Sequence, residues 1–369
     1  MNGSAEALTR REVIRALLPF SKSSTVRGVG LFLSDWVLYW ICIAGILFLP
    51  GLGWKIAASM FAASRLPNMI TLGHDAAHGA LTPHKRLNWL LGVLCLTPCL
   101  MNYRLWVFDH HVLHHRNTNR DHKDTWTPIS KAEFDAFSAW KQALHRFYRH
   151  PNVFSLAIYY AIERWSYSKI IPLAHVSEKY RPSAWRHFIF LLFYAVLFIT
   201  ALALAPQYSG TTSAEALLLG FVLPFFVELA SFSWVLWAMH TLPEVGWFRP
   251  QVSPMQGAEA SELVSVHLEL PAWFEIATHG ITNHPVHHLL PAIPIYHLGA
   301  AQAKYAELVG VLNVKHKFSF RNLFDTARRC KLYDFENNRW LDFEGNPTGE
   351  LTRPFCHAEA VARYLDERG

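Results

Sequence analysis

Histidines occur in three closely spaced clusters, and their spacing is the first feature of this sequence that points to chemistry. On a helix, residues three and four positions apart share a face, so each cluster can aim several imidazoles at one point. Pro285, inside the third cluster, fits such a helix if it lies in the first turn. The clustered histidines are His74 and His78; His111, His114 and His115; and His284, His287 and His288.

This collection of imidazoles predicts a site for two metal ions. Imidazole is a ligand for iron, copper and zinc. Eight clustered histidines are more than one tetrahedral zinc site uses, and the HExxH pattern of zinc peptidases does not occur in the sequence. The five cysteines include no CxxC pair, which argues against a cysteine zinc site and against a disulfide framework.

Composition places these histidines in a membrane protein. Hydrophobic residues make up 51% of the 369 residues and charged residues only 17%, whereas a soluble domain carries about 25% charged residues. The formal net charge is +6. In so apolar a chain, a positive charge favours basic cytoplasmic loops over nucleic-acid binding, so no nucleic-acid partner is expected.

Four stretches are long and apolar enough to cross a bilayer, which takes about 20 residues. They are 29–49, 54–72, 188–205 and 216–239. The connections 50–53 and 206–213 carry no charge, whereas 1–28 holds five basic residues and 110–187 is rich in Lys and Arg. The positive-inside rule then predicts a cytoplasmic N-terminal segment (1–28), a membrane domain (29–297) and a cytoplasmic C-terminal tail (298–369).

This topology brings all three histidine clusters to the same side of the membrane. The first cluster follows the second span, the second lies in the basic segment between spans two and three, and the third follows span four. The expected fold is therefore an all-α integral membrane protein. Its four transmembrane helices form two hairpins, and a cytoplasmic helical cap carries the metal site.

In its histidine clusters and in the placement of its spans, the sequence resembles the membrane fatty acid desaturases, whose three histidine boxes bind two iron ions. The resemblance rests on GHDAAHG (73–79), HHVLHHRNTNRDHKDTWTP (110–128) and HPVHHLLPAIPIYHL (284–298). It is greatest to acyl-lipid desaturases of the delta-12 and omega-3 type. Hydroxylases and ketolases that act on carotenoids share the boxes and remain an alternative.

The resemblance also implies a ninth ligand, and residues beside the ligands are expected to support them. Relatives carry an extra histidine at the cytoplasmic end of the last span, where this chain has His240. Met239 and Leu242 stand where that pattern has a glutamine and a second histidine. The residues expected to orient the ligands are Asp75, Asp109, His110 and His279. His122 is among the histidines expected to be ordinary.

For the function, the resemblance implies insertion of a cis double bond into an acyl chain with O₂ and two external electrons. The sequence has no GxGxxG fingerprint and no HPGG haem motif. The electrons are therefore expected to come from a separate donor, ferredoxin or cytochrome b5. A non-enzymatic membrane transporter with histidine proton relays is the alternative from another class, although transport would require ionisable residues across the spans.

Two charged residues fall inside the expected spans. Arg65 precedes His74 by nine residues and Glu228 precedes His240 by twelve, about 14 and 18 Å along a helix. Since isolated charges within a bilayer are costly, an ion pair between Arg65 and Glu228 is expected.

Overall fold

The computed structural model describes residues 8–120, 125–249 and 260–366. It is mostly helical and divides into two compact units, each built from segments distant in the sequence. Unit 1 comprises 1–22, 111–156 and 234–369, and unit 2 comprises 23–110 and 157–233. The expected boundary at 297/298 falls inside a helix of unit 1 (Ile295–Val309). His122 lies outside the described residues.

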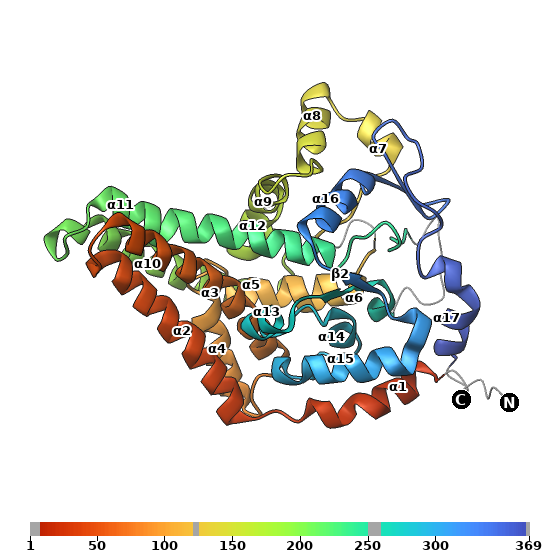
Figure 1. The fold of residues 1–369 in the computed structure, drawn as a ribbon, viewed down its shortest axis with the longest axis horizontal. Coiled ribbons are helices and arrows are strands. Elements are labelled where there is room, and N and C mark those ends of the chain that lie inside the picture. The colour runs from red at the N-terminus through yellow and green to blue at the C-terminus, as the bar shows by residue number, and fades with distance from the viewer. Residues whose placement is uncertain (1–7, 121–124, 250–259, 367–369) are drawn as a thin grey trace. The chain divides into compact units, whose positions relative to one another are not determined.

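Unit 2 contains the long apolar helices, which are visible in Figure 1. Within the described part of the chain, three helices are long and apolar enough to cross a membrane: Thr25–Phe48, Arg181–Ala203 and Ser213–Ala238. They correspond to the first, third and fourth expected spans. The protein is therefore a membrane protein. The helices of this unit are α2 (Thr25–Phe48), α3 (Leu52–His78), α4 (Lys85–Leu96), α5 (Tyr103–Val107), α10 (Arg181–Ala203), α11 (Ser213–Leu217), η5 (Leu218–Val222) and α12 (Leu223–Ala238), with the π-helix η3 (Tyr160–Ile170) and the short η4 (Ala205–Gln207) between them.

The second expected span lies in α3, which is not among the three apolar helices because it is more polar. Its 27 residues nevertheless make a helix about 40 Å long, more than the thickness of a bilayer core. α3 packs against α2, and Ser59 in α3 donates a hydrogen bond to the Leu219 carbonyl in η5 at 2.6 Å. By contrast, α4 has 12 residues and is too short to cross a membrane.

The expected ion pair between Arg65 and Glu228 is wrong. Arg65 instead pairs with Asp35 of α2, with 2.9 Å between Nη1 and Oδ1. Residues 35 and 65 are equally distant in sequence from the turn at Pro50, so an antiparallel hairpin brings them to the same depth. Glu228 is fully buried, and its carboxyl oxygens have no hydrogen-bond partner among the described residues.

Unit 1 is built from short helices and two small sheets. β1 (His267–Glu269) pairs in parallel with β2 (Lys315–Lys317), and β3 (Leu332–Asp334) pairs antiparallel with β4 (Arg339–Leu341). Helix α1 (Arg10–Leu17) lies along α15 (Ile295–Val309), as Figure 1 shows. The other helices are η1 (Leu18–Ser21), α6 (His115–Asn117), α7 (Lys131–Asp135), α8 (Ala139–Tyr148), η6 (Ser261–Val264), α13 (Ala272–Ala277), α14 (His284–Leu289), η7 (Gly310–Leu312), α16 (Phe320–Arg329), η8 (Phe355–His357) and α17 (Ala358–Tyr364). Three elements run across the division between the units: the π-helix η2 (Phe108–His114), α9 (Ser155–Tyr159) and α12, whose residues 234–238 belong to unit 1.

One buried carboxylate ties both terminal regions of unit 1 to its interior. Glu262 in η6 is fully buried and accepts hydrogen bonds from Arg10 Nε at 2.6 Å and from the Tyr364 hydroxyl at 2.9 Å. Arg10 lies in α1 and Tyr364 in α17, so a single side chain holds the first and last helices of the described chain.

Replacing Glu262 by glutamine is expected to destabilise unit 1 by about 1–2 kcal/mol, because it removes the charge from three hydrogen bonds, two of them from a partly exposed arginine. Thermal unfolding in detergent measures the effect. Arg11→Gln is the matched control, since Arg11 is exposed on the same helix. Equal unfolding temperatures for the two variants would show that the contact contributes little.

Candidate metal centre

The first histidine cluster occupies the last turn of α3. His74 and His78 are four residues apart and therefore share a helix face, with ring centroids 4.8 Å apart. Gly79 ends the helix in a left-handed conformation, with φ of 75°, which glycine adopts without steric cost. Gly73 lets Leu96 of α4 approach closely, since an added Cβ would lie 2.9 Å from its side chain.

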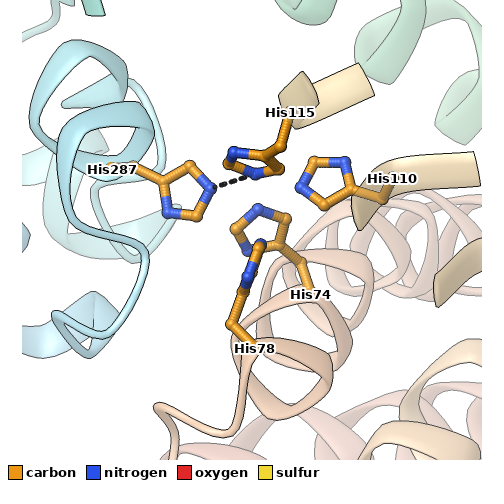
Figure 2. Close-up of side chains that lie close together, drawn as sticks. All are labelled: His74, His78, His110, His115 and His287. Atoms are coloured by element: carbon orange, nitrogen blue, oxygen red, sulfur yellow. Dashed lines mark hydrogen bonds between the residues drawn. The ribbon is translucent and has the colours of Figure 1, made fainter. Parts of the chain in front are cut away.

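His110 lies beside these two rings within unit 2. Its ring centroid is 4.6 Å from that of His74 and 5.2 Å from that of His78. Trp106, one turn earlier, stacks on the His110 ring with a centroid distance of 4.5 Å. Figure 2 shows the three imidazoles facing one another at the end of α3.

The second histidine cluster does not follow the expected α-helical spacing. Residues Phe108–His114 form a π-helix, η2, in which hydrogen bonds join residues five apart rather than four. An α-helix would place His111 on one face with His114 and His115. With π-helical spacing, His110 takes that position instead. Among the described residues, His111 belongs to neither of the two groups whose nitrogens could hold a metal ion. In the structure it is therefore His110, expected as a supporting residue, and not His111, expected as a ligand, whose ring lies in one of these groups.

Unit 1 contains a complete group of four histidines. One ligand nitrogen from each of His114, His240, His284 and His288 lies within 4.8 Å of the others. Nε2 of His284 is 2.8 Å from Nε2 of His240 and 2.9 Å from Nε2 of His288. Such convergence of imidazole nitrogens on one point is the arrangement that a metal ion requires.

Helix α14 carries the third cluster and begins at His284, so Pro285 lies in its first turn as expected. Side chains of other segments contact this helix. The Val286 N–H donates to Oε1 of Gln302 in α15 at 3.2 Å. Thr118 Oγ1 lies 3.4 Å from Nδ1 of His288, the ring nitrogen that points away from the group. Such a contact can set the tautomer of a ligand.

His240 comes directly after α12 and is held by the backbone. Its N–H donates to the Trp237 carbonyl at 3.1 Å, and its own carbonyl accepts from Asn119 Nδ2 at 3.1 Å. The same amide nitrogen donates to the Gly246 carbonyl at 3.0 Å. Asn119 therefore joins the segment after the second cluster to the segment after α12.

His115 and His287 form a separate pair in unit 1. Their Nε2 atoms are 3.1 Å apart and their ring centroids 5.0 Å apart (Figure 2). His287 is on the same short helix as His284 and His288, but its ring makes this contact with His115 instead.

Burial keeps several of these rings neutral. It lowers the pKa of the His240 and His288 imidazoles well below the ordinary value, and neighbouring histidines lower it further. Burial also lowers the pKa of His111 to about 4. A neutral imidazole offers a lone pair to a metal ion, so the lowered pKa favours the metal-binding form of His240 and His288.

The four supporting residues expected from the sequence have different surroundings. Asp75 is buried in the last turn of α3. Asp109 forms a buried ion pair with Lys169 of η3. His279 follows α13 with φ of 58° and is outside the four-histidine group. His110 joins the rings of the first cluster, as described above.

Three residues around the four-histidine group were not expected from the sequence: Thr118, Asn119 and Gln302. Thr118 and Asn119 follow the second cluster after two intervening residues, within the motif at 110–128, but nothing in the sequence was a reason to assign them a role. Gln302 gave no signal, because its contact depends on how α14 and α15 pack.

The chain is similar over most of its length to known membrane-lipid enzymes. The family model described as "Fatty acid desaturase" matches residues 52–317. The "sn-1 oleoyl-lipid 12-desaturase" of Synechocystis is 28% identical over 296 residues, covering 79% of this chain and 80% of that protein. The "Omega-6 fatty acid desaturase, chloroplastic" of Spinacia oleracea is 25% identical over 303 residues, or 81% of this chain and 64% of that protein. The "sn-1 acyl-lipid omega-3 desaturase (ferredoxin)" of Nostoc is 26% identical over 301 residues, or 81% of this chain and 77% of that protein.

Proposed function

The chain belongs to the fatty acid desaturase family and is an oxidoreductase, and on this basis we propose that it binds two iron ions through nine histidines. His110 takes the place first expected for His111, because of the π-helical turn in η2. The proposed ligands are His74, His78, His110, His114, His115, His240, His284, His287 and His288.

The four-histidine group of unit 1 is the single observation that carries this proposal. Its nitrogens already converge, burial lowers the pKa of two of its rings, His240 and His288, and it draws on both the second and third clusters and on His240. For the second iron, the proposal combines the three rings at the end of α3 with the pair His115 and His287. It rests on the family's use of all three boxes.

Iron in such a site supplies O₂ activation, the chemistry needed to remove hydrogen from an unactivated methylene pair. Overall, one O₂, two hydrogens from the acyl chain, two external electrons and two protons give a cis double bond and two waters. The side chains hold the imidazoles in place. Thr118 meets the outer nitrogen of His288, Gln302 anchors the start of α14, and Asn119 fixes the backbone at His240. Burial of His240 and His288 keeps bulk water away.

For the membrane topology, we propose four spans in two hairpins, with both termini, the 1–28 segment, the 298–369 tail and the metal site on the cytoplasmic face. Contacts within unit 2 support the hairpins. The Thr211 hydroxyl, between α10 and α11, donates to the Leu47 carbonyl at 2.7 Å, and Lys55 Nζ donates to the Thr211 oxygen at 2.8 Å. The α2–α3 turn and the α10–α11 turn are therefore neighbours, as two hairpins with their turns on one side require.

The proposed substrate is an acyl chain esterified to a membrane lipid. The names of the relatives support this choice, since two of them are called oleoyl-lipid or acyl-lipid desaturases. A separate ferredoxin or cytochrome b5 is the proposed electron donor. The name of the Nostoc relative includes ferredoxin.

Expression in a host without polyunsaturated lipids tests the function. Fatty acids and pigments are both profiled, with His114→Ala as the inactive control. We expect a new polyunsaturated acid in cells with the natural chain and none with the variant. A change confined to pigments would favour a hydroxylase or ketolase. No change in either profile would count against the enzyme assignment.

A further inference from the structure

A groove in unit 2 lies outside the metal centre and is not used by the function proposed above. Helices α4, α5 and α10 enclose about 550 Å³ of largely apolar space, a volume in the range of ligand sites. Three large apolar side chains on its border are exposed: Trp89 at 45%, Leu90 at 45% and Phe190 at 46%.

The groove lies at one end of a membrane helix. Its α10 residues, Ser183 to Phe190, belong to the first turns of a helix long and apolar enough to span the bilayer. Trp89 of α4 lines the groove and is exposed. Trp185 is a neighbour in sequence of the groove residues of α10 and is exposed too. Exposed tryptophans at the end of a membrane helix are typical of the boundary between lipid and water. Lipid molecules therefore have access to the groove.

Two arginines give the groove a positive end. Arg104 of α5 and Arg186 of α10 both line it, and neither makes an ion pair with a carboxylate among the described residues, nor a side-chain hydrogen bond there. Arg181, also at the start of α10, differs, because its guanidinium donates to the Val176 and Ala174 carbonyls at 2.8 and 3.1 Å. Arg104 and Arg186 thus retain their donors for an anionic ligand.

Closely packed rings lie beside these arginines. The His187 ring lies 5.9 Å from the Tyr103 ring and 6.3 Å from the Trp89 ring, measured between centroids. Tyr103 packs so closely on α4 that a Cβ added at Gly92 would lie 2.4 Å from its ring. The groove therefore exists before any ligand binds, which reduces the entropy lost on binding.

We propose that this groove binds a membrane phospholipid with an anionic headgroup. The phosphate contacts Arg104 and Arg186, and an acyl chain lies along Trp89, Leu90 and Phe190. Guanidinium groups match phosphate oxygens in both charge and geometry, and the apolar length of the groove suits a hydrocarbon chain. Binding does not require that this lipid be the substrate, so the inference stands apart from the proposed desaturase function.

Lipid retention in nanodiscs tests the proposal. The full chain is placed in phosphatidylcholine nanodiscs that contain a small fraction of dioleoyl phosphatidylglycerol, and bound lipid is counted by native mass spectrometry. We expect Arg104→Gln and Arg186→Gln each to weaken phosphatidylglycerol binding about fivefold, and the double variant about 25-fold. Arg27→Gln is the matched control, since it removes an exposed arginine at the start of α2 and should change binding little.

A variant that fills the groove separates the site from general attraction to a basic surface. Leu94 lines the groove, and Leu94→Trp should reduce retention of phosphatidylglycerol while all arginines remain. Measuring each variant also in a His240→Ala background shows whether binding persists without enzyme activity, as we expect. Equal retention by the arginine variants and Arg27→Gln would overturn the proposal. It would also fail if Leu94→Trp had no effect, or if free oleate competed as strongly as phosphatidylglycerol.

Discussion

Replacing His240 by alanine is expected to remove at least one iron ion per chain and to lower the desaturation rate by more than about 100-fold. Loss of a residue that merely orients a ligand costs about 10- to 100-fold, so loss of a ligand should cost more. His240 Nε2 lies 2.8 Å from Nε2 of His284, in the middle of the group that also contains His114 and His288. Its ring is buried, so solvent does not replace it easily.

Iron analysis of the purified protein and the fatty acid profile of expressing cells measure the two effects. His150→Ala is the matched control, because His150 is an exposed histidine of unit 1 that interacts with its neighbour Asn152. We expect this control to keep the iron content and activity of the natural chain. A His240→Ala protein that retains full iron would show that this residue is not a ligand, even if its activity were lost.

The expectation for His240 came from the resemblance and not from local spacing. His240 has no clustered neighbour in the sequence, so periodicity alone gave no reason to select it. The structure brings it to His114, His284 and His288 because α12 ends beside α14, and such packing is a property of the whole fold. By contrast, the pairing of His74 with His78 follows from helical spacing within one element, which makes it predictable from sequence.

The ion pair of Arg65 shows a second limit of prediction from sequence. Helical rise suggested similar depths for Arg65 and Glu228, but depth does not decide which helices are neighbours. Asp35 is at a matching distance from the turn in the adjacent helix of the hairpin and is the actual partner. Counting residues from Pro50 in both directions would have identified it.

Hydropathy predicts the first, third and fourth spans clearly, and the second span, in α3, less clearly. The helix that carries the first histidine cluster, α3, includes Lys55, Arg65 and Asn68, each of which makes a hydrogen bond with a side chain of a neighbouring segment of unit 2. Polar residues with such partners lower the hydropathy of a helix without exposing charge. A criterion based on hydropathy and charge alone therefore gives a weaker signal for this helix.

Substitutions in the second cluster test whether the ligands follow α-helical or π-helical spacing. An α-helix would present His111 together with His114 and His115, whereas the π-helix η2 presents His110. The His110 ring lies 4.6 Å from that of His74 and is stacked on Trp106. His111 is the next residue, so the two positions form a closely matched pair for substitution.

We expect His110→Ala to lower the iron content and to reduce desaturation by more than about 100-fold, as for any ligand, and His111→Ala to keep most of its iron with a smaller loss of rate, within the range of about 10- to 100-fold for residues that act through a ligand. Iron per chain is the deciding measurement, since activity alone would also fall if either change disturbed the helix. The reverse result, iron lost in His111→Ala and retained in His110→Ala, would mean that the second cluster binds metal with α-helical spacing. A π-helical turn would then not be what selects the ligand, and the nine-histidine set would have to include His111 instead of His110.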